Sequence, residues 1–384
     1  MKIDEVLKDI ADKGNLRRIP NDSTSDEFHY IDFSTNDYLG LATDRSLRVE
    51  FLKEATSDDS MLLSTSASRL LAASQRYHFE LEDCMRQMYG GGKDILLFNS
   101  GYHANTGILP ALSDRATLIV ADRLVHASLI DGIVLSRCDF RRFLHNDIDS
   151  LERIIKSNYD KYETIIVVAE SVYSMDGDHA PIMRLVELKN RYDKIFLYLD
   201  EAHAFGVEGP NGLGLAYESN CEVWDVIVGT FGKALASMGA FAVVSPKMKE
   251  FLINKCRSLI FSTALPPLQI AWTKKIIGLL PNLEDKRIYL QQLASKFSET
   301  LSNVSNISNE RSHIQPLIIG NATQAIELSE TLLKYNIKVL AIRTPTVPAG
   351  TERLRFSLSA SMTLDDIEKT KYALENIFRN SEYK

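Results

Sequence analysis

The sequence predicts an α/β protein, with a large domain built on a mostly parallel sheet and a smaller C-terminal α+β domain. Three observations support this prediction. Short apolar runs alternate with helical patterns between about residues 46 and 275. After about residue 280 the pattern changes to a long helical stretch followed by alternating strands. The chain has 384 residues and is 45% hydrophobic, which is enough to bury the cores of roughly two to three domains.

The large domain is expected to span residues 46–278, after an N-terminal helix and polar connector over residues 1–45. A strand that is covered on both faces is apolar at nearly every position. Five runs fit that description, namely residues 95–98, 117–121, 164–169, 195–199 and 226–228. Because a parallel sheet binds its ligand at the carboxyl ends of its strands, polar residues there are the first candidates for a site.

The small domain is expected to span residues 279–384. A helix is predicted over residues 285–304, and strands over residues 314–319, 339–342 and 353–359. Thr363 is a suitable N-cap for a last helix, with Asp365 and Asp366 in its first turn.

Composition excludes several functions. The net charge of −7 and the lack of a basic block argue against general nucleic-acid binding. The four cysteines form no CxxC pair, and the eight histidines form no HExxH motif, so we expect reduced thiols and no metal site. The first ten residues are charged, unlike a signal peptide, and no run approaches the ~18 apolar residues of a membrane helix. These features indicate a cytoplasmic enzyme.

Polar residues follow two neighbouring apolar runs. Asp200 ends one run, and His203 comes three residues later. A buried carboxylate beside a pyridine nitrogen would keep that nitrogen protonated, as the chemistry of pyridoxal phosphate (PLP) requires. Lys233 follows the next run among small residues, and a desolvated lysine readily forms imines. Each feature in isolation also fits a helix cap, a surface histidine or a solvated lysine.

Two further strand ends have the same character. Residues 99–105, Asn-Ser-Gly-Tyr-His-Ala-Asn, are expected to open a helix whose free N–H groups favour a phosphate. His126 follows the next strand, where an imidazole could lie flat against a cofactor ring. An ordinary strand-to-helix turn and a structural histidine are the alternatives.

A loop near the C-terminus is fixed by two prolines and a glycine over residues 345–350, and an alternating strand follows it. Arg353 and Arg355 are expected to project from one face of that strand. An arginine held on a strand is a good bidentate ligand for a carboxylate, although solubility of an edge strand would also explain it.

Together and in this order, these segments resemble the α-oxoamine synthase family of PLP enzymes, which have the PLP-dependent transferase fold of type I. The resemblance runs from residues 36–41 to Leu358 and includes residues 170–178 and 261–267. It implies an acyltransferase that binds PLP and condenses a small amino acid with an acyl thioester, carried on coenzyme A or acyl-carrier protein. It also implies a homodimer with shared active sites.

The resemblance also assigns roles. It implies that Lys233 holds PLP as a Schiff base, that Asp200 pairs with the pyridine nitrogen, that His203 bonds the phenolic oxygen and that His126 stacks on the ring. The other residues implied to contact a cofactor are Gly101, Tyr102, Ser174 and Thr230, with Ser262 and Thr263 reaching the cofactor of the partner subunit. The residues implied to contact substrate are Arg17 (with Arg18 a near-equal match), Asn36, His126, Thr346 and Arg355.

Residues 145–147, 314–318 and 341–351 favour the branch of the family that joins L-alanine to a pimeloyl thioester in biotin biosynthesis. A branch that uses glycine or another acyl-CoA stays open, as do a non-catalytic subunit and a module that binds acyl-carrier protein. One departure is visible, because residues 64–69 read Ser-Thr-Ser-Ala-Ser-Arg where the family has a glycine-rich run. Loss of glycine removes the freedom to adopt positive φ and adds bulk, which puts the choice of acyl donor in doubt.

Overall fold

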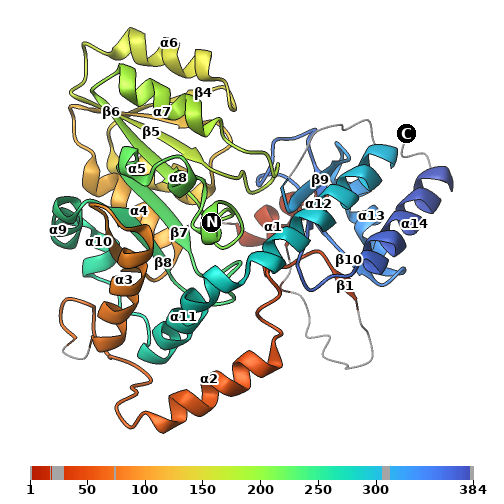
Figure 1. The fold of residues 1–384 in the computed structure, drawn as a ribbon. Helices are drawn as coiled ribbons and strands as arrows, with labels where there is room; N and C mark the ends of the chain where they lie inside the picture. The colour runs from red at the N-terminus through yellow and green to blue at the C-terminus, as the bar shows by residue number, and fades with distance from the viewer. Residues whose placement is uncertain (1, 18, 20–29, 73–74, 305–311, 381–384) are drawn as a thin grey trace. The chain divides into compact units, whose positions relative to one another are not determined.

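The structure is a computed structural model that describes residues 2–17, 19, 30–72, 75–304 and 312–380 (Figure 1). The chain forms two compact units. The large unit comprises Leu39–Ser174 and His179–Arg287, and the small unit comprises Met1–Tyr38, Met175–Asp178 and Ile288–Lys384. The domain boundaries predicted after residues 45 and 278 stay a prediction. None of the helices in the described ranges has the length and apolar character needed to cross a bilayer.

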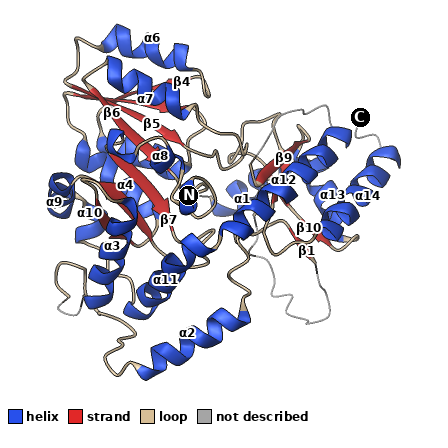
Figure 2. Cartoon of the chain, in the orientation of Figure 1, coloured by secondary structure: helices blue, strands red, loops and turns tan. Residues whose placement is uncertain are grey.

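A seven-stranded sheet forms the centre of the large unit, with the strand order β2-β8-β7-β6-β5-β3-β4. Figure 2 draws its strands in red among the blue helices. Strands β7, β6, β5, β3 and β4 run parallel to their neighbours in that series, whereas β8 is antiparallel to both β2 and β7. The strands are β2 (Asp94–Phe98), β3 (Thr117–Asp122), β4 (Asp139–Phe143), β5 (Thr164–Glu170), β6 (Ile195–Asp200), β7 (Val226–Thr230) and β8 (Ala240–Val244).

The predicted mostly parallel sheet is confirmed, and all five predicted runs are strands of it. Every residue of β3, β7 and β8 is buried, as expected for a sheet that is covered on both faces. Two strands were not predicted. The sequence Asp-Phe-Arg-Arg-Phe of β4 is mostly exposed at the sheet edge, and β8 is an apolar run that returns antiparallel soon after β7.

Helices alternate with these strands. Those of the large unit are α2 (Arg45–Ser57), α3 (Arg76–Tyr89), α4 (Gly101–Leu112), α5 (Ala127–Ser136), α6 (Ile148–Asn158), α7 (Ile182–Arg191), α8 (Leu215–Glu218), α9 (Pro246–Lys255), α10 (Arg257–Ile260) and α11 (Pro267–Leu279). Short 3-10 helices are η1 (Pro210–Gly212), η2 (Cys221–Val223) and η3 (Leu280–Asn282). The helices that position the site are α4 and α5, which begin just past the carboxyl ends of β2 and β3.

The small unit contains a three-stranded antiparallel sheet in the order β11-β12-β9 and a two-stranded parallel pair, β1 with β10. Its strands are β1 (Ile31–Asp32), β9 (Ile314–Ile318), β10 (Ile337–Lys338), β11 (Leu340–Ile342) and β12 (Arg353–Ser357). Its helices are α1 (Ile3–Asp12), α12 (Glu284–Val304, in this unit from Ile288), α13 (Ala322–Leu333) and α14 (Leu364–Asn380). The predicted helices and strands of this part are therefore confirmed, with ends shifted by one or two residues.

Aromatic packing and capping explain local features of the small unit. The rings of Phe33, Phe297 and Phe356 form a core cluster with centroids 5.0–5.3 Å apart. Thr363 caps α14 as predicted, because its Oγ1 accepts the N–H of Asp366 at 3.1 Å while Asp366 Oδ2 accepts the N–H of Thr363 at 2.8 Å.

Candidate active site

The carboxyl ends of β6 and β7 bring three predicted residues together. The two strands are adjacent and parallel, so Asp200, at the end of β6, and the turn that carries Lys233 leave the sheet at the same edge. The Nζ atom of Lys233 lies 2.7 Å from Nε2 of His203. Asp200 and His203 are each 5% exposed. An amine and an imidazole are thus in contact, and a buried carboxylate lies at the same edge of the sheet.

The Asp200 carboxylate is held by donors from two directions. Its Oδ1 accepts the N–H of Ala202 at 2.9 Å, and its Oδ2 accepts Nδ2 of Asn105 at 2.7 Å. Asn105 lies on α4 and was not predicted as a functional residue. A carboxylate that accepts these bonds keeps lone pairs for a further donor.

His126 is the N-cap of α5. Its Nδ1 accepts the N–H of Ser128 at 3.2 Å and lies 2.8 Å from Ser128 Oγ. Burial lowers the pKa of His126 and outweighs the opposing effect of the Asp200 charge, so the imidazole is neutral near pH 7. A neutral ring in this position is suited to contact with an aromatic cofactor.

Glu170, at the end of β5, lies beside these groups and was not predicted as a functional residue. Its two oxygens accept the backbone N–H groups of His126 and Ser174, the latter at 3.3 Å. Burial, followed by the nearby charge of Asp200, raises the pKa of Glu170 to about 8. One carboxyl group therefore ties together the backbones of two residues that were predicted to contact the cofactor.

The start of α4 has the features of an anion site. Gly101 is its first residue, and Ser100 caps it by accepting the N–H of His103 at 3.2 Å. A Cβ atom built on Gly101 would lie 3.9 Å from Cβ of Thr230, which places the end of β7 beside this turn. Tyr102 is 48% exposed and donates its hydroxyl to Asp131.

The segment of Ser262 and Thr263 pairs with the segment that departs from the glycine-rich pattern. Thr263 forms an antiparallel bridge with Ser68, and the N–H of Ala264 donates to the carbonyl of Ala67 at 3.0 Å. Ser66, which stands where a glycine was expected, adopts a φ of +50°. The serine thus takes the left-handed conformation that the departure was expected to disfavour.

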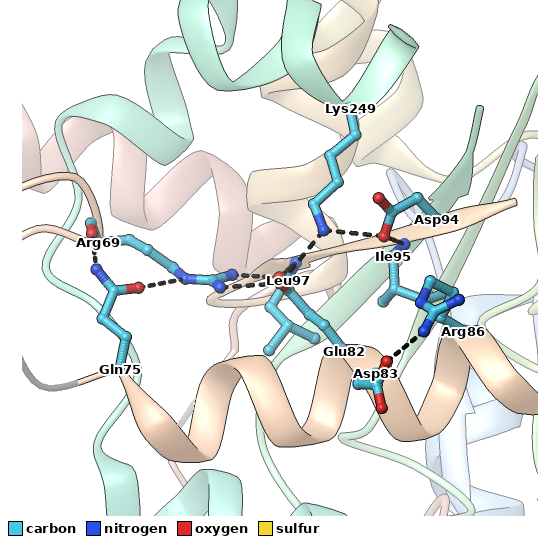
Figure 3. A network of polar contacts seen from close by, with 9 residues as sticks. All are labelled: Arg69, Gln75, Glu82, Asp83, Arg86, Asp94, Ile95, Leu97 and Lys249. Atoms are coloured by element: carbon cyan, nitrogen blue, oxygen red, sulfur yellow. Dashed lines mark hydrogen bonds and ion pairs between the residues drawn. The ribbon is translucent and has the colours of Figure 1, made fainter. Parts of the chain in front are cut away.

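Arg69 anchors this paired segment through a polar network (Figure 3). Its guanidinium group makes two contacts with the carboxylate of Glu82 on α3, and its Nε donates to Gln75 at 3.0 Å. The Nζ atom of Lys249 on α9 contacts both Glu82, at 3.4 Å, and Asp94 at the start of β2, at 2.9 Å. The network links the segment to two helices and a strand.

Four of the five predicted substrate residues lie in the small unit, where they form two pairs, whereas His126 lies in the large unit. Arg355 is 6% exposed, and its Nη1 donates to Asn36 Oδ1 at 3.2 Å. Arg17 donates to Thr346 Oγ1 at 2.8 Å. Arg18, the near-equal match to Arg17, lies outside the described residues. Arg353 has a different environment, because it forms an ion pair with Asp176 at 2.7 Å.

The large unit fits PLP by the chemistry of its groups. Lys233 would supply an amine for the aldehyde, Asp200 would supply a buried carboxylate for the ring nitrogen, and the twelve-residue helix α4, which opens on Gly101, would receive the phosphate. Within the described residues, no group of three or more His, Cys, Asp and Glu side chains is placed to hold a metal ion.

The chain belongs to the aminotransferase class I and II family, which it matches over residues 29–375. It is 47% identical over 349 residues to the "Putative 8-amino-7-oxononanoate synthase" of Pasteurella multocida (strain Pm70), with 90% of each chain covered. It is 43% identical over 372 residues to the protein of the same name from Haemophilus influenzae (strain ATCC 51907 / DSM 11121 / KW20 / Rd), with 95% of this chain and 97% of that protein covered.

Solved structures give the same class. A serine palmitoyltransferase from S. paucimobilis with bound PLP-myriocin aldimine is 27% identical, with a TM-score of 0.87 and 98% of each chain covered. The 8-amino-7-oxononanoate synthase from Francisella tularensis is 29% identical, with a TM-score of 0.74 and 90% of this chain and 97% of that chain covered. The predicted fold type and PLP cofactor are confirmed, and the chain is a PLP-dependent enzyme of the α-oxoamine synthase type.

Proposed function

We propose that this enzyme condenses L-alanine with a pimeloyl thioester to give 8-amino-7-oxononanoate, a step of biotin biosynthesis. The observation that carries the proposal is the cluster of Lys233, His203 and Asp200, in a chain whose relatives of 43–47% identity bear the name of that synthase. The carrier of the pimeloyl group would be coenzyme A or acyl-carrier protein.

Bound PLP would act as an electron sink for the negative charge that develops at Cα of the amino acid. Lys233 would hold the cofactor and, once displaced by alanine, take the proton from Cα and later return it. Asp200 would stabilise a positive charge on the ring nitrogen, and His203 would bond the phenolic oxygen. His126, neutral and buried, would lie against the ring. These assignments are supported by the contacts in the large unit.

The atoms of the reaction balance as follows. Once Cα of alanine has lost its proton to Lys233, a bond would form between Cα and the thioester carbonyl carbon, and the C–S bond would break to release the thiolate. The alanine carboxylate then departs as CO2, and a proton is added at Cα. Arg355 with Asn36 would hold that carboxylate before it is lost, because a buried arginine is a strong carboxylate ligand. Thr346 with Arg17 would contact the substrate as the second pair.

We further propose a homodimer in which Ser262 and Thr263 reach the cofactor of the partner. In support, Phe261, the residue before Ser262, is 70% exposed, and Leu71, three residues after the paired Ser68, is 80% exposed. Gly101, Tyr102, Ser174 and Thr230 would complete the cofactor contacts within one subunit.

A substrate panel tests the proposal. Purified holoenzyme is incubated with each pairing of alanine, glycine or serine with pimeloyl, acetyl, succinyl or palmitoyl thioester, and products are identified by mass spectrometry. The proposal expects turnover to be highest for alanine with the pimeloyl thioester and absent in Lys233→Ala. Preference for serine with a palmitoyl thioester, or for glycine with a short acyl group, would overturn the substrate assignment and leave the enzyme class unchanged.

A further inference from the structure

Asn105 is a buried side chain that none of the proposed chemical steps uses. It lies on α4 and is 1% exposed. Its amide has three polar partners, two on β6 and one on α5. Nδ2 donates to Asp200 Oδ2 at 2.7 Å and to Ser128 Oγ at 2.9 Å, and Oδ1 accepts the hydroxyl of Tyr198 at 2.7 Å.

Only one orientation of this amide satisfies all three partners. An ionised carboxylate can only accept, so the NH2 group must face Asp200. The phenol of Tyr198 is buried, and burial raises its pKa well above 10, so it keeps its proton and donates it to Oδ1. Both hydrogens and the oxygen of Asn105 are thus committed, and the Asp200 carboxylate is fixed by a side chain that is itself fixed.

The hydrogen bonds of Asn105 also constrain His126, through Ser128. Ser128 Oγ accepts a hydrogen from Asn105, so its own hydrogen is free to point toward Nδ1 of His126, 2.8 Å away. The N–H of Ser128 also points to this atom. Because Nδ1 receives donors, it carries no proton, and the neutral ring has its hydrogen on Nε2. The network therefore determines the tautomer of His126.

The close packing of α4 on α5 keeps Asn105 within hydrogen-bond distance of Ser128. A Cβ atom at Gly132 on α5 would lie 2.5 Å from the carbonyl oxygen of Asn105. Only glycine allows the two helices to approach this closely at that point, so the backbone of Asn105 is held against the helix that begins at His126.

We propose that Asn105 is a positioning residue, whose amide fixes the carboxylate of Asp200 and, through Ser128, the ring of His126. The inference rests on the proposed roles of Asp200 and His126 toward the cofactor. It adds that the two groups are set by one side chain, so that a change at Asn105 disturbs both.

The test measures the cofactor without substrate. PLP is titrated into apoprotein to obtain its dissociation constant, and the visible absorption and induced circular dichroism of the bound cofactor are recorded at one pH. We expect Asn105→Ala to bind PLP about tenfold more weakly, because a hydrogen bond to a charged group is lost, and to change the induced dichroism. Tyr198→Phe keeps the ring but releases the amide oxygen, and should change the same signals less.

The matched control is Asn158→Ala, which removes another buried asparagine on a helix of the large unit, where its amide bonds the carbonyl of Ile154. It should lower the melting temperature but leave PLP affinity and dichroism unchanged. If Asn105→Ala behaves like this control, the proposal is overturned. If Asn105→Ala does not fold, unchanged affinity and dichroism in Tyr198→Phe overturn it instead. Because no substrate is present, a failed substrate panel leaves this result intact.

Discussion

Replacing Arg69 with methionine tests the anchor of the segment that pairs with Thr263. The side chain of Arg69 is 12% exposed and that of Glu82 is 4% exposed, and the two are joined by paired contacts. Arg69→Met keeps most of the side-chain volume but leaves Glu82 buried without its main partner. Removal of one member of a buried ion pair costs roughly 3–5 kcal/mol.

For Glu82 we expect a cost at the lower end of this range. Lys249 remains 3.4 Å from Glu82 Oε2, and the N–H of Leu97 donates to Oε1 at 3.3 Å, so the carboxylate keeps two weaker partners. We therefore expect Arg69→Met to lower the free energy of unfolding by about 3 kcal/mol. The double variant Arg69→Met/Glu82→Met should recover most of the loss, because no unpaired charge is then buried.

Urea unfolding of the apoprotein, followed by circular dichroism, measures this change. The control is Arg86→Met, which breaks the pair with Asp83 on the surface of the same helix, where the side chains are 49% and 52% exposed. Figure 3 draws this pair, and its removal should lower the free energy of unfolding by no more than about 0.5 kcal/mol. A loss below about 1 kcal/mol in Arg69→Met, or no recovery in the double variant, would refute the reasoning.

Three other predictions concern single residues. Ser66→Gly should stabilise the protein by about 0.5–1 kcal/mol in urea unfolding, because an exposed residue at φ +50° loses its strain; unchanged stability would argue against it. Burial raises the pKa of Glu170 from the ordinary 4.5 to about 8, so between these values the native state binds more protons than the unfolded state. The free energy of unfolding should therefore fall as pH rises from about 5 to 8. Glu170→Gln should make the free energy of unfolding depend less on pH over this range. An equally steep decrease in the variant would contradict the raised pKa of Glu170. Arg355→Ala should raise KM for the amino acid about a hundredfold and leave PLP affinity unchanged. Steady-state kinetics measure the first quantity and a PLP titration the second, and an unchanged KM would contradict the prediction.

Much of the site could be predicted from sequence, because a parallel sheet binds its ligand at the carboxyl ends of its strands. Asp200 and Lys233 have 32 residues between them in the sequence. Both nevertheless come at or after the carboxyl end of an apolar run, and a parallel sheet places these ends at one edge. That rule does not depend on knowing which strands are neighbours. The individual signals were weak because a cap, a loop lysine or a surface histidine has the same sequence appearance.

Asn105, Ser128 and Glu170 could not be identified in the same way. Their roles depend on the approach of α4, α5, β5 and β6, which no local pattern encodes. An asparagine among the apolar residues of α4 is the one signal that could have been followed, because a buried amide needs polar partners. Strand β4 was missed because an edge strand tolerates polar residues, so its pattern lacks the apolar run.

The most direct test of the active-site account is the identity of the lysine that holds the cofactor. Holoenzyme is reduced with borohydride, digested, and its peptides are sequenced by mass spectrometry. We expect a single pyridoxyl group on Lys233, within the turn that follows β7, and no labelled peptide in Lys233→Ala. Label on a different lysine of the wild-type enzyme, or label that persists in the variant, would contradict it.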